Sequence, residues 1–196
     1  MLKAYKYRIY PNSEQRIQIA KTFGCCRFVY NQTLAYRKEI YEKEKKSVSK
    51  TDCNNYCNRE LKKDYEWLKE IDKFAVSNAV FHLADAYDRF FKKQNHFPKF
   101  KSKRKSKKSY TANFTNNNIL IGKNVIKLPK VGMVKAVIHK LPKDDWKLKS
   151  VTVSQDSVGN YFASVLFEYE QEDIPSVSKS STNAIGLDYK SDGLYM

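Results

Sequence analysis

The sequence has no long hydrophobic run. No apolar stretch approaches the roughly 20 residues that a membrane-spanning helix needs, and residues 1–8 lack the apolar core of a signal peptide. These absences argue against a membrane protein and against a secreted one. We therefore expect a cytoplasmic protein with no membrane partner.

Cysteine is scarce, with four residues, and its spacing does not give the CxxC pairs of a zinc ribbon. Cys25 and Cys26 are adjacent, whereas Cys53 and Cys57 are four apart. Two cysteines at that spacing could share one face of a helix and ligate a metal. Because free cysteine usually packs as a small hydrophobic residue, we expect four reduced, half-buried thiols.

Acidic residues are also in short supply. The 196 residues contain 21 Asp and Glu against 37 Lys and Arg, which gives a formal net charge of +16. Such an excess of cations attracts polyanions, and nucleic acid is the leading candidate. The apolar content of 41% and the aromatic content of 14% are ample for a folded core, so the chain is not a disordered tail.

The positive charge is concentrated in residues 92–108, where nine of the seventeen residues are Lys or Arg and none is acidic. Phe97, Phe100 and Tyr110 are interleaved with these cations, and such aromatics either anchor a segment or stack on bases. The dominance of lysine favours sequence-tolerant contact with phosphates, since bidentate reading of bases is mostly the work of arginine. The alternative is a merely solvated loop.

The N-terminal part predicts one strand and two helices. Residues 2–10 alternate between apolar and basic side chains, as in a short strand. Asn12 and Gln15 match a capping box, so a helix should begin near Glu14 and end where Gly24 breaks it. A second helix is expected over residues 25–46. Helix, glycine turn and helix would suit a helix-turn-helix, but an ordinary antiparallel helical hairpin is favoured on spacing alone.

Two further helices are predicted over residues 50–65 and 73–94. The last has the clearest periodicity in the chain, because its apolar residues recur at intervals of four and three: Val76, Val80, Leu83, Tyr87 and Phe90. We interpret this stripe as core packing. The polar residues on its other faces, among them Ser77, Asn78 and His82, are the ones left for contact with a partner.

After residue 109 the period becomes two. Short strands are predicted at 110–114, 119–121, 125–128, 133–139, 148–154 and 161–169, separated by Asn-, Gly- and Pro-containing turns. Strands of this number and spacing suggest a small barrel. Residues 171–183 are rich in Ser and polar residues and predict a linker.

Five stretches, in one order along the chain, together resemble a known family. They are Tyr5-Lys6-Tyr7-Arg8-Ile9-Tyr10-Pro11 with Glu14-Gln15, Cys26-Arg27-Phe28-Val29-Tyr30-Asn31, Ala86-Tyr87-Asp88-Arg89-Phe90-Phe91, Phe97-Pro98-Lys99-Phe100-Lys101-Ser102-Lys103, and Gly186-Leu187-Asp188. The chain resembles the N-terminal half of TnpB (OrfB), the RNA-guided DNA endonuclease encoded by bacterial and archaeal insertion sequences.

The resemblance implies an α+β fold, in which a helical recognition domain is inserted into a small, OB-like wedge β-barrel. The first strand of a truncated RNase H-like (RuvC) domain would follow. The ranges would be 1–10 for the first barrel strand, 11–96 for the helical recognition domain, 97–109 for a basic linker, 110–170 for the barrel, 171–183 for a second linker and 184–196 for the start of the nuclease domain.

The resemblance also implies the partners, which are a guide RNA and the target double-stranded DNA in the nucleoid. An intact family member or a transposase from the same element is a further expected partner. Ser77 and Asn78 fall where family members carry polar residues on the recognition helix, so we expect them to contact a short motif beside the target. The remaining expected nucleic-acid contacts are Lys3, Lys6, Arg8, Arg27, Lys92, Lys93, Lys99, Lys101, Lys103, Arg104, Lys105, Lys107, Lys108 and Tyr110.

By the same resemblance Asp188 is the first catalytic aspartate, a ligand of the two-Mg²⁺ site that full-length members use. The family's later glutamate, its final aspartate and its cysteine-rich zinc insertion have no counterpart here. We therefore expect no tight Mg²⁺ binding and no cleavage by this chain alone. We also expect residues 1–170 to fold and the last fifteen or so residues to be disordered or sticky.

Three interpretations of the function stay open at this point. The first is a truncated TnpB that cleaves only in its complete form. The second is a stand-alone DNA- or RNA-binding module that represses or competes with an intact copy. The third is a basic structural protein that associates with ribosomes or membrane surfaces, and the aromatic-interleaved basic segment argues against it.

Overall fold

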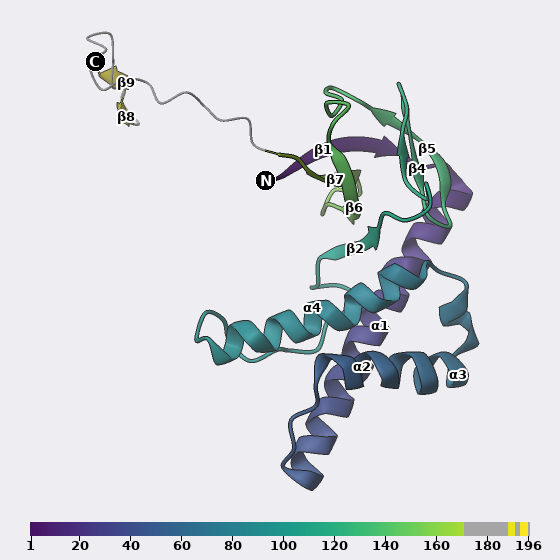
Figure 1. Ribbon diagram of the computed structural model, residues 1–196, viewed down its shortest axis with the longest axis vertical. Helices are drawn as coiled ribbons and strands as arrows, with labels where there is room; N and C mark the ends of the chain where they lie inside the picture. Colours follow the sequence, from purple (N-terminus) through teal and green to yellow (C-terminus); the bar gives the residue numbers. More distant parts are fainter. Residues whose placement is uncertain (171–187, 191–192, 196) are drawn as a thin grey trace.

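The computed structural model describes residues 1–170, 188–190 and 193–195. The helices lie on one side of a β-sheet, and the chain starts in the sheet, leaves it for the helices and then returns (Figure 1). The helical elements are α1 (Ser13–Glu44), α2 (Lys50–Tyr56), a π-helical turn (Cys57–Leu61), α3 (Lys62–Asp64), a 3-10 turn (Glu66–Lys69) and α4 (Lys73–Phe91). The strands are β1 (Leu2–Tyr10), β2 (Lys108–Asn113), β3 (Leu120–Ile121), β4 (Val125–Leu128), β5 (Gly132–Val137), β6 (Lys147–Gln155), β7 (Tyr161–Glu168), β8 (Asp188–Lys190) and β9 (Gly193–Tyr195).

The N-terminal strand β1 is the centre of a seven-stranded sheet with the order β2-β6-β7-β1-β5-β4-β3. It pairs antiparallel with β7 along its length and with β5 at its C-terminal end. Its alternation is the reason for this position, because Tyr5, Tyr7 and Ile9 are buried on one face while Lys6 and Tyr10 are exposed on the other. The prediction that residues 2–10 join the later strands is confirmed.

The predicted strands are confirmed with small shifts at their ends, and all the pairings are antiparallel. Within residues 1–170 the hydrogen-bonded order ends at β2 on one edge and β3 on the other. The ladder is therefore open in the described residues, and the small OB-like barrel that the sequence suggested stays a prediction. The structure shows an antiparallel sheet packed on helices, which is an α+β fold.

The predicted break at Gly24 is wrong. Residues 13–44 form one helix of 32 residues, about 48 Å long, which begins at the predicted capping box of Asn12 and Gln15. A glycine costs about 1 kcal/mol inside a helix, but packing on both sides of Gly24 outweighs this cost. Phe23 contacts Tyr110 of β2, and Cys26 donates from Sγ to the Ala75 carbonyl of α4 at 3.3 Å.

Helix α4 confirms the predicted stripe. Val76, Val80, Leu83 and Tyr87 are buried, and the last two form a cluster with Tyr30 and Leu34 of α1. The helix begins at Asp72, whose carboxylate accepts from the Ala75 backbone N–H at 3.0 Å. It ends at Phe91, three residues earlier than predicted. The two long helices therefore pack along each other and carry the segment that follows α4.

All four cysteines are free, and all are buried, which is deeper than the half-burial that the sequence predicted. Burial raises the pKa of the Cys25 and Cys57 thiols to about 11, so both are neutral at pH 7. No group of three or more His, Cys, Asp or Glu residues within the described part of the chain is placed to hold a metal ion.

The strands β8 and β9 form a short antiparallel hairpin in which Asp188 pairs with Tyr195. The predicted linker at 171–183 and the apolar residues before Asp188 lie outside the described residues, as does most of the segment expected to be disordered. Within the described residues, no helix is both long and apolar enough to cross a membrane.

Candidate nucleic-acid interface

The side chain of Asn31 hydrogen-bonds the basic segment, residues 92–108, to α1. The Asn31 amide donates from Nδ2 to the Lys101 carbonyl at 2.9 Å, and its Oδ1 accepts from the Lys101 backbone N–H at 2.8 Å. The amide thus satisfies both backbone groups of Lys101, as a neighbouring β-strand would. Phe97 adds an apolar anchor, because its ring packs edge-on against Tyr87 and Phe90 of α4. The segment is therefore held at two points before any partner binds.

Beyond Lys101 the chain forms a tight turn closed by two serines. The Ser102 N–H donates to Ser106 Oγ at 2.9 Å, and Ser102 Oγ accepts from the Lys105 N–H at 3.0 Å. A backbone bond from the Ser106 N–H to the Ser102 carbonyl, at 3.2 Å, completes the turn. The three exposed residues at its tip are all cationic: Lys103, Arg104 and Lys105. We call residues 102–106 the cationic turn.

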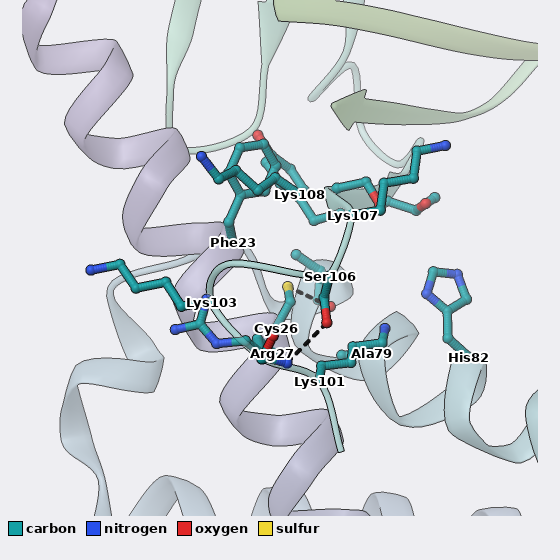
Figure 2. Close-up of a pocket in the computed structure, with 15 residues that line it drawn as sticks. Phe23, Cys26, Arg27, Ala79, His82, Lys101, Lys103, Ser106, Lys107 and Lys108 are labelled. Atoms are coloured by element: carbon teal, nitrogen blue, oxygen red, sulfur yellow. Dashed lines mark hydrogen bonds between the residues drawn. The ribbon is translucent and has the colours of Figure 1, made fainter. Parts of the chain in front are cut away.

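The cationic turn borders a small cavity between α1, α4 and β2, shown in Figure 2. Five of its fifteen lining residues are Lys or Arg and none is Asp or Glu: Arg27, Lys101, Lys103, Lys107 and Lys108. Only about 30 Å³ is open to a water-sized sphere. A nucleotide therefore does not enter this cavity, and the chemistry available here is contact along a charged surface.

Lys101 differs from its neighbours because it is half-buried. Its ammonium lies 4.0 Å from the centre of the Tyr30 ring, and desolvation lowers the pKa of Lys101. His82 lines the same cavity, where desolvation and then the nearby Lys101 cation lower the pKa of its imidazole. His82 is therefore neutral at pH 7, and the charge of this surface comes from Lys and Arg alone.

The predicted contacts in the first strand lie elsewhere, because β1 and the basic segment are separated in the fold (Figure 1). Lys6 and Arg8 are on the outer face of the sheet, where both cations lie over the Phe162 ring. Arg8 also donates to the Asn160 side chain. Lys3 is near the opposite face, 5.6 Å from the Trp146 ring. The structure does not bring these three cations to the cationic turn.

Several other predicted contacts are exposed along the segment from α4 to β2: Lys92, Lys93, Lys99, Lys107 and Lys108. Lys108 also donates to Gln155 Oε1 of β6 at 3.0 Å. No Lys or Arg of residues 92–108 forms an ion pair with a carboxylate in the described part of the chain. Their charge is therefore free for an external anion.

Ser77 and Asn78 are half-buried on α4 next to the edge of the sheet. The Asn78 Nδ2 group donates to the Thr111 carbonyl at 2.8 Å and to Asn113 Oδ1 at 3.1 Å. Asn78 thus satisfies a backbone group on the free edge of β2, which protects an edge strand from unwanted pairing. Reading of a target-adjacent motif by these two residues stays a prediction.

Two further predicted site residues are Tyr110, which is buried, and Asp188, whose side chain is not described. Tyr110 is only 3% exposed, and its ring packs on Phe23 behind the cationic surface. Asp188 is the first residue of β8, and its side chain lies outside the described structure. Asn31, Ser102 and Ser106 were not among the site residues predicted from the sequence. The four-residue spacing of the two serines around a Lys/Arg triplet is the one signal that could have indicated the turn.

Comparison of the amino-acid sequence with known proteins identifies related proteins. The model of a helix-turn-helix domain of OrfB proteins matches residues 1–46, although here these residues form β1 and the single helix α1. A protein of Streptomyces pristinaespiralis, named as a candidate RNA-guided DNA endonuclease, is 32% identical over 189 residues. InsQ of Escherichia coli K12, with the same designation, is 28% identical over 190 residues.

Each of these two matches covers 95% of this chain but 45% of the relative. The chain therefore spans less than half the length of these curated relatives. The virulence protein VsdF of Salmonella dublin is 35% identical over 113 residues, which are 53% of this chain and 95% of VsdF. The helix-turn-helix domain match and the relatives agree with the motifs read from the sequence, and the chain belongs to the TnpB/OrfB family.

Proposed function

We propose that this chain is the nucleic-acid-binding region of an RNA-guided DNA endonuclease, and that it holds guide RNA and target DNA through the cationic turn and the surface around it. The observation that carries the proposal is a cavity rim with five cations and no carboxylate. Such a surface gains affinity by releasing counterions from a phosphate backbone.

The ordering of the cationic turn supports the same function. The turn is already closed by its serines and clamped by Asn31, so less conformational entropy is lost when a phosphate chain binds. The shallowness of the cavity and the excess of lysine favour contact with the backbone over reading of bases. We propose that sequence reading resides in the guide RNA and, for the target-adjacent motif, in Ser77 and Asn78.

We further propose that residues 11–96 form the recognition domain and that the sheet forms the wedge. Asp188 would then be the first aspartate of the RuvC site. No group of three or more His, Cys, Asp or Glu residues is placed to hold a metal ion within the described residues, and we propose no cleavage step for this chain.

The salt dependence of binding tests the cationic turn. The change is Lys103→Gln, Arg104→Gln and Lys105→Gln together, and the control changes three other exposed cations: Lys63→Gln, Lys69→Gln and Lys123→Gln. Log Kd is measured against log salt for a short RNA duplex. The slope should fall by about two to three in the turn variant, because each lost phosphate contact removes about 0.7 to 0.9. Equal slopes in both variants would refute the proposal.

A second experiment identifies the ligand. The 196-residue chain is purified from its host, and the bound nucleic acid is extracted and sequenced. One dominant RNA transcribed from the end of the element that encodes the chain supports guide-RNA binding by this region. A heterogeneous mixture that the turn variant retains would contradict it.

VsdF favours a second candidate, a stand-alone binding module. Nearly all of that relative, 95%, matches 53% of this chain, so a protein can consist of about half of this region with little else. Acting alone, this chain would compete with an intact family member for RNA. Addition of the chain to a cleavage reaction of the intact protein should then slow it, and the turn variant should not.

A further inference from the structure

A groove lies at the far end of the α1–α4 pair from the sheet. It is formed by the last turns of α1, by residues 46–48 and by the end of α4 together with Phe97. About 360 Å³ is open to a water-sized sphere, which is within the range of about 300–1,000 Å³ that ligand pockets occupy. The cavity beside the cationic turn is more than ten times smaller.

Five of the eleven residues that line this groove, which we call the aromatic groove, are aromatic: Tyr41, Tyr87, Phe90, Phe91 and Phe97. Phe91 is 67% exposed and Tyr41 is 59% exposed. Scattered single apolar residues on a surface need no explanation, but contiguous aromatic rings around a hollow mark a contact site. Most of the surface of the Phe91 and Tyr41 side chains is thus left uncovered by the chain itself.

The charge around the aromatic groove indicates what it contacts. Arg37, Lys38 and Lys46 line it against a single carboxylate, Glu42. The Arg37 guanidinium lies 3.8 Å from the centre of the Tyr87 ring. An anionic ligand with a flat, apolar part is complementary to cations around aromatic rings.

The aromatic groove is also continuous with the basic segment. Phe97 belongs to both, and the Lys38 ammonium lies between Phe97 and Phe100, at 5.8 Å and 5.5 Å from their ring centres. Phe100 directly precedes Lys101 and the cationic turn. A single-stranded nucleic acid that contacts the cationic turn could therefore continue past Phe100 and Lys38 to the aromatic groove.

We propose that the aromatic groove binds an unpaired base of single-stranded nucleic acid, which stacks on Phe91 and Tyr41 while its phosphates contact Lys38. The inference rests on the proposed function, because it places a base-binding subsite beside the phosphate-binding surface. Bases within a duplex have no free face for such stacking, so the ligand is single-stranded.

The test compares two single-stranded oligonucleotides of equal length and charge, one of adenines and one with abasic sites at its centre. Their Kd ratio is measured for the 196-residue chain at one salt concentration. Wild type should prefer the adenine strand, and Phe91→Ala should reduce that preference about fivefold or more while leaving abasic binding unchanged. Ile17→Ala, at a residue 61% exposed near the other end of α1, is the control and should change neither value.

Conservative variants separate stacking from apolar contact. Phe91→Tyr should keep the preference for bases, and Phe91→Leu should lose it. Salt-dependent binding of both strands without a preference in wild type would overturn this inference and leave the proposed function standing. Absence of binding to either strand would overturn both. If Phe91→Ala converts a dimer into a monomer in light scattering without altering base preference, the groove contacts a second copy of the chain and the inference fails.

Discussion

The side-chain amide of Asn31 pairs with both backbone polar groups of Lys101, seventy residues further along the chain. This pair of hydrogen bonds fixes the backbone of Lys101 relative to α1. Both of these hydrogen bonds of the Asn31 side chain go to backbone groups, so its contribution to binding would come from positioning.

Loss of this clamp should weaken binding without changing its salt dependence. Asn31→Ala removes both hydrogen bonds but none of the positive charges. We expect Kd for RNA to rise several-fold while the slope of log Kd against log salt stays constant, because the number of phosphate contacts is kept. Trypsin should also cleave residues 99–108 faster. Asn95→Ala, at an exposed neighbouring asparagine, is the control, and equal trypsin rates in the two variants would contradict the role of Asn31.

Gly24→Ala should stabilise the protein. Gly24 lies inside α1, and an added Cβ would meet no atom within 4 Å. The free energy of unfolding should rise by about 0.5–1 kcal/mol, the helix preference of alanine over glycine, in urea titrations followed by circular dichroism. Gly159→Ala is the matched comparison and should be destabilising, since the φ of Gly159 is +95°. A loss of stability in Gly24→Ala would mean that α1 bends at this residue.

Asp72→Asn should change the pH dependence of stability. Burial raises the pKa of the Asp72 carboxyl above its ordinary value, against the opposing effect of its hydrogen bonds. The folded state then binds more protons than the unfolded state between the two pKa values, so the free energy of unfolding of the wild type falls as pH rises through that window.

Asparagine keeps the helix cap and removes this charge. The free energy of unfolding of Asp72→Asn should therefore rise relative to that of the wild type as the pH increases above the ordinary aspartate pKa of about 3.9, measured by urea unfolding at each pH. Asp72→Ala loses the cap as well and should cost about 0.5–2 kcal/mol. A difference between Asn and wild type that is constant with pH would show that this carboxyl has an ordinary pKa in the fold.

Tyr110→Phe should leave nucleic-acid affinity unchanged. The Tyr110 side chain is 3% exposed, and its hydroxyl has no hydrogen-bond partner among the described residues. Because an unsatisfied buried hydroxyl is costly, the free energy of unfolding should stay constant or rise by about 1 kcal/mol. A drop in RNA affinity in this variant, with stability unchanged, would place Tyr110 in the interface after all.

The strands and α4 could be predicted because their signals are local. Alternation of period two determined β1, and the stripe from Val76 to Tyr87 determined α4. The continuity of α1 could not be predicted, since Gly24 has a low helix propensity and the packing that overrides it comes from Tyr110 and Ala75, far along the chain.

The candidate site was predictable only as a charge pattern. The Lys and Arg residues from 99 to 108 are visible in the sequence, whereas the Asn31 clamp joins two elements that no local pattern connects. Tyr110, by contrast, was predicted as a nucleic-acid contact from the sequence but is buried in the fold. An aromatic beside lysines suits base stacking by type, yet strand parity turns its ring toward Phe23 and the core.

The central position of β1 has a consequence for how the protein is made. Leu2 pairs with Glu168, and Arg8 pairs with Phe162. A ribosome adds about 5–20 residues per second, so roughly ten to thirty seconds separate the synthesis of β1 from that of β7. The helices can form within this interval, because their backbone hydrogen bonds join residues four apart, and the packing partners of α1 at Ala75 and Tyr110 are made before β7. The strand that leaves the ribosome first can pair with β5 once residues 132–137 are made, but a nascent chain released before β7 would leave β1 without its longest pairing.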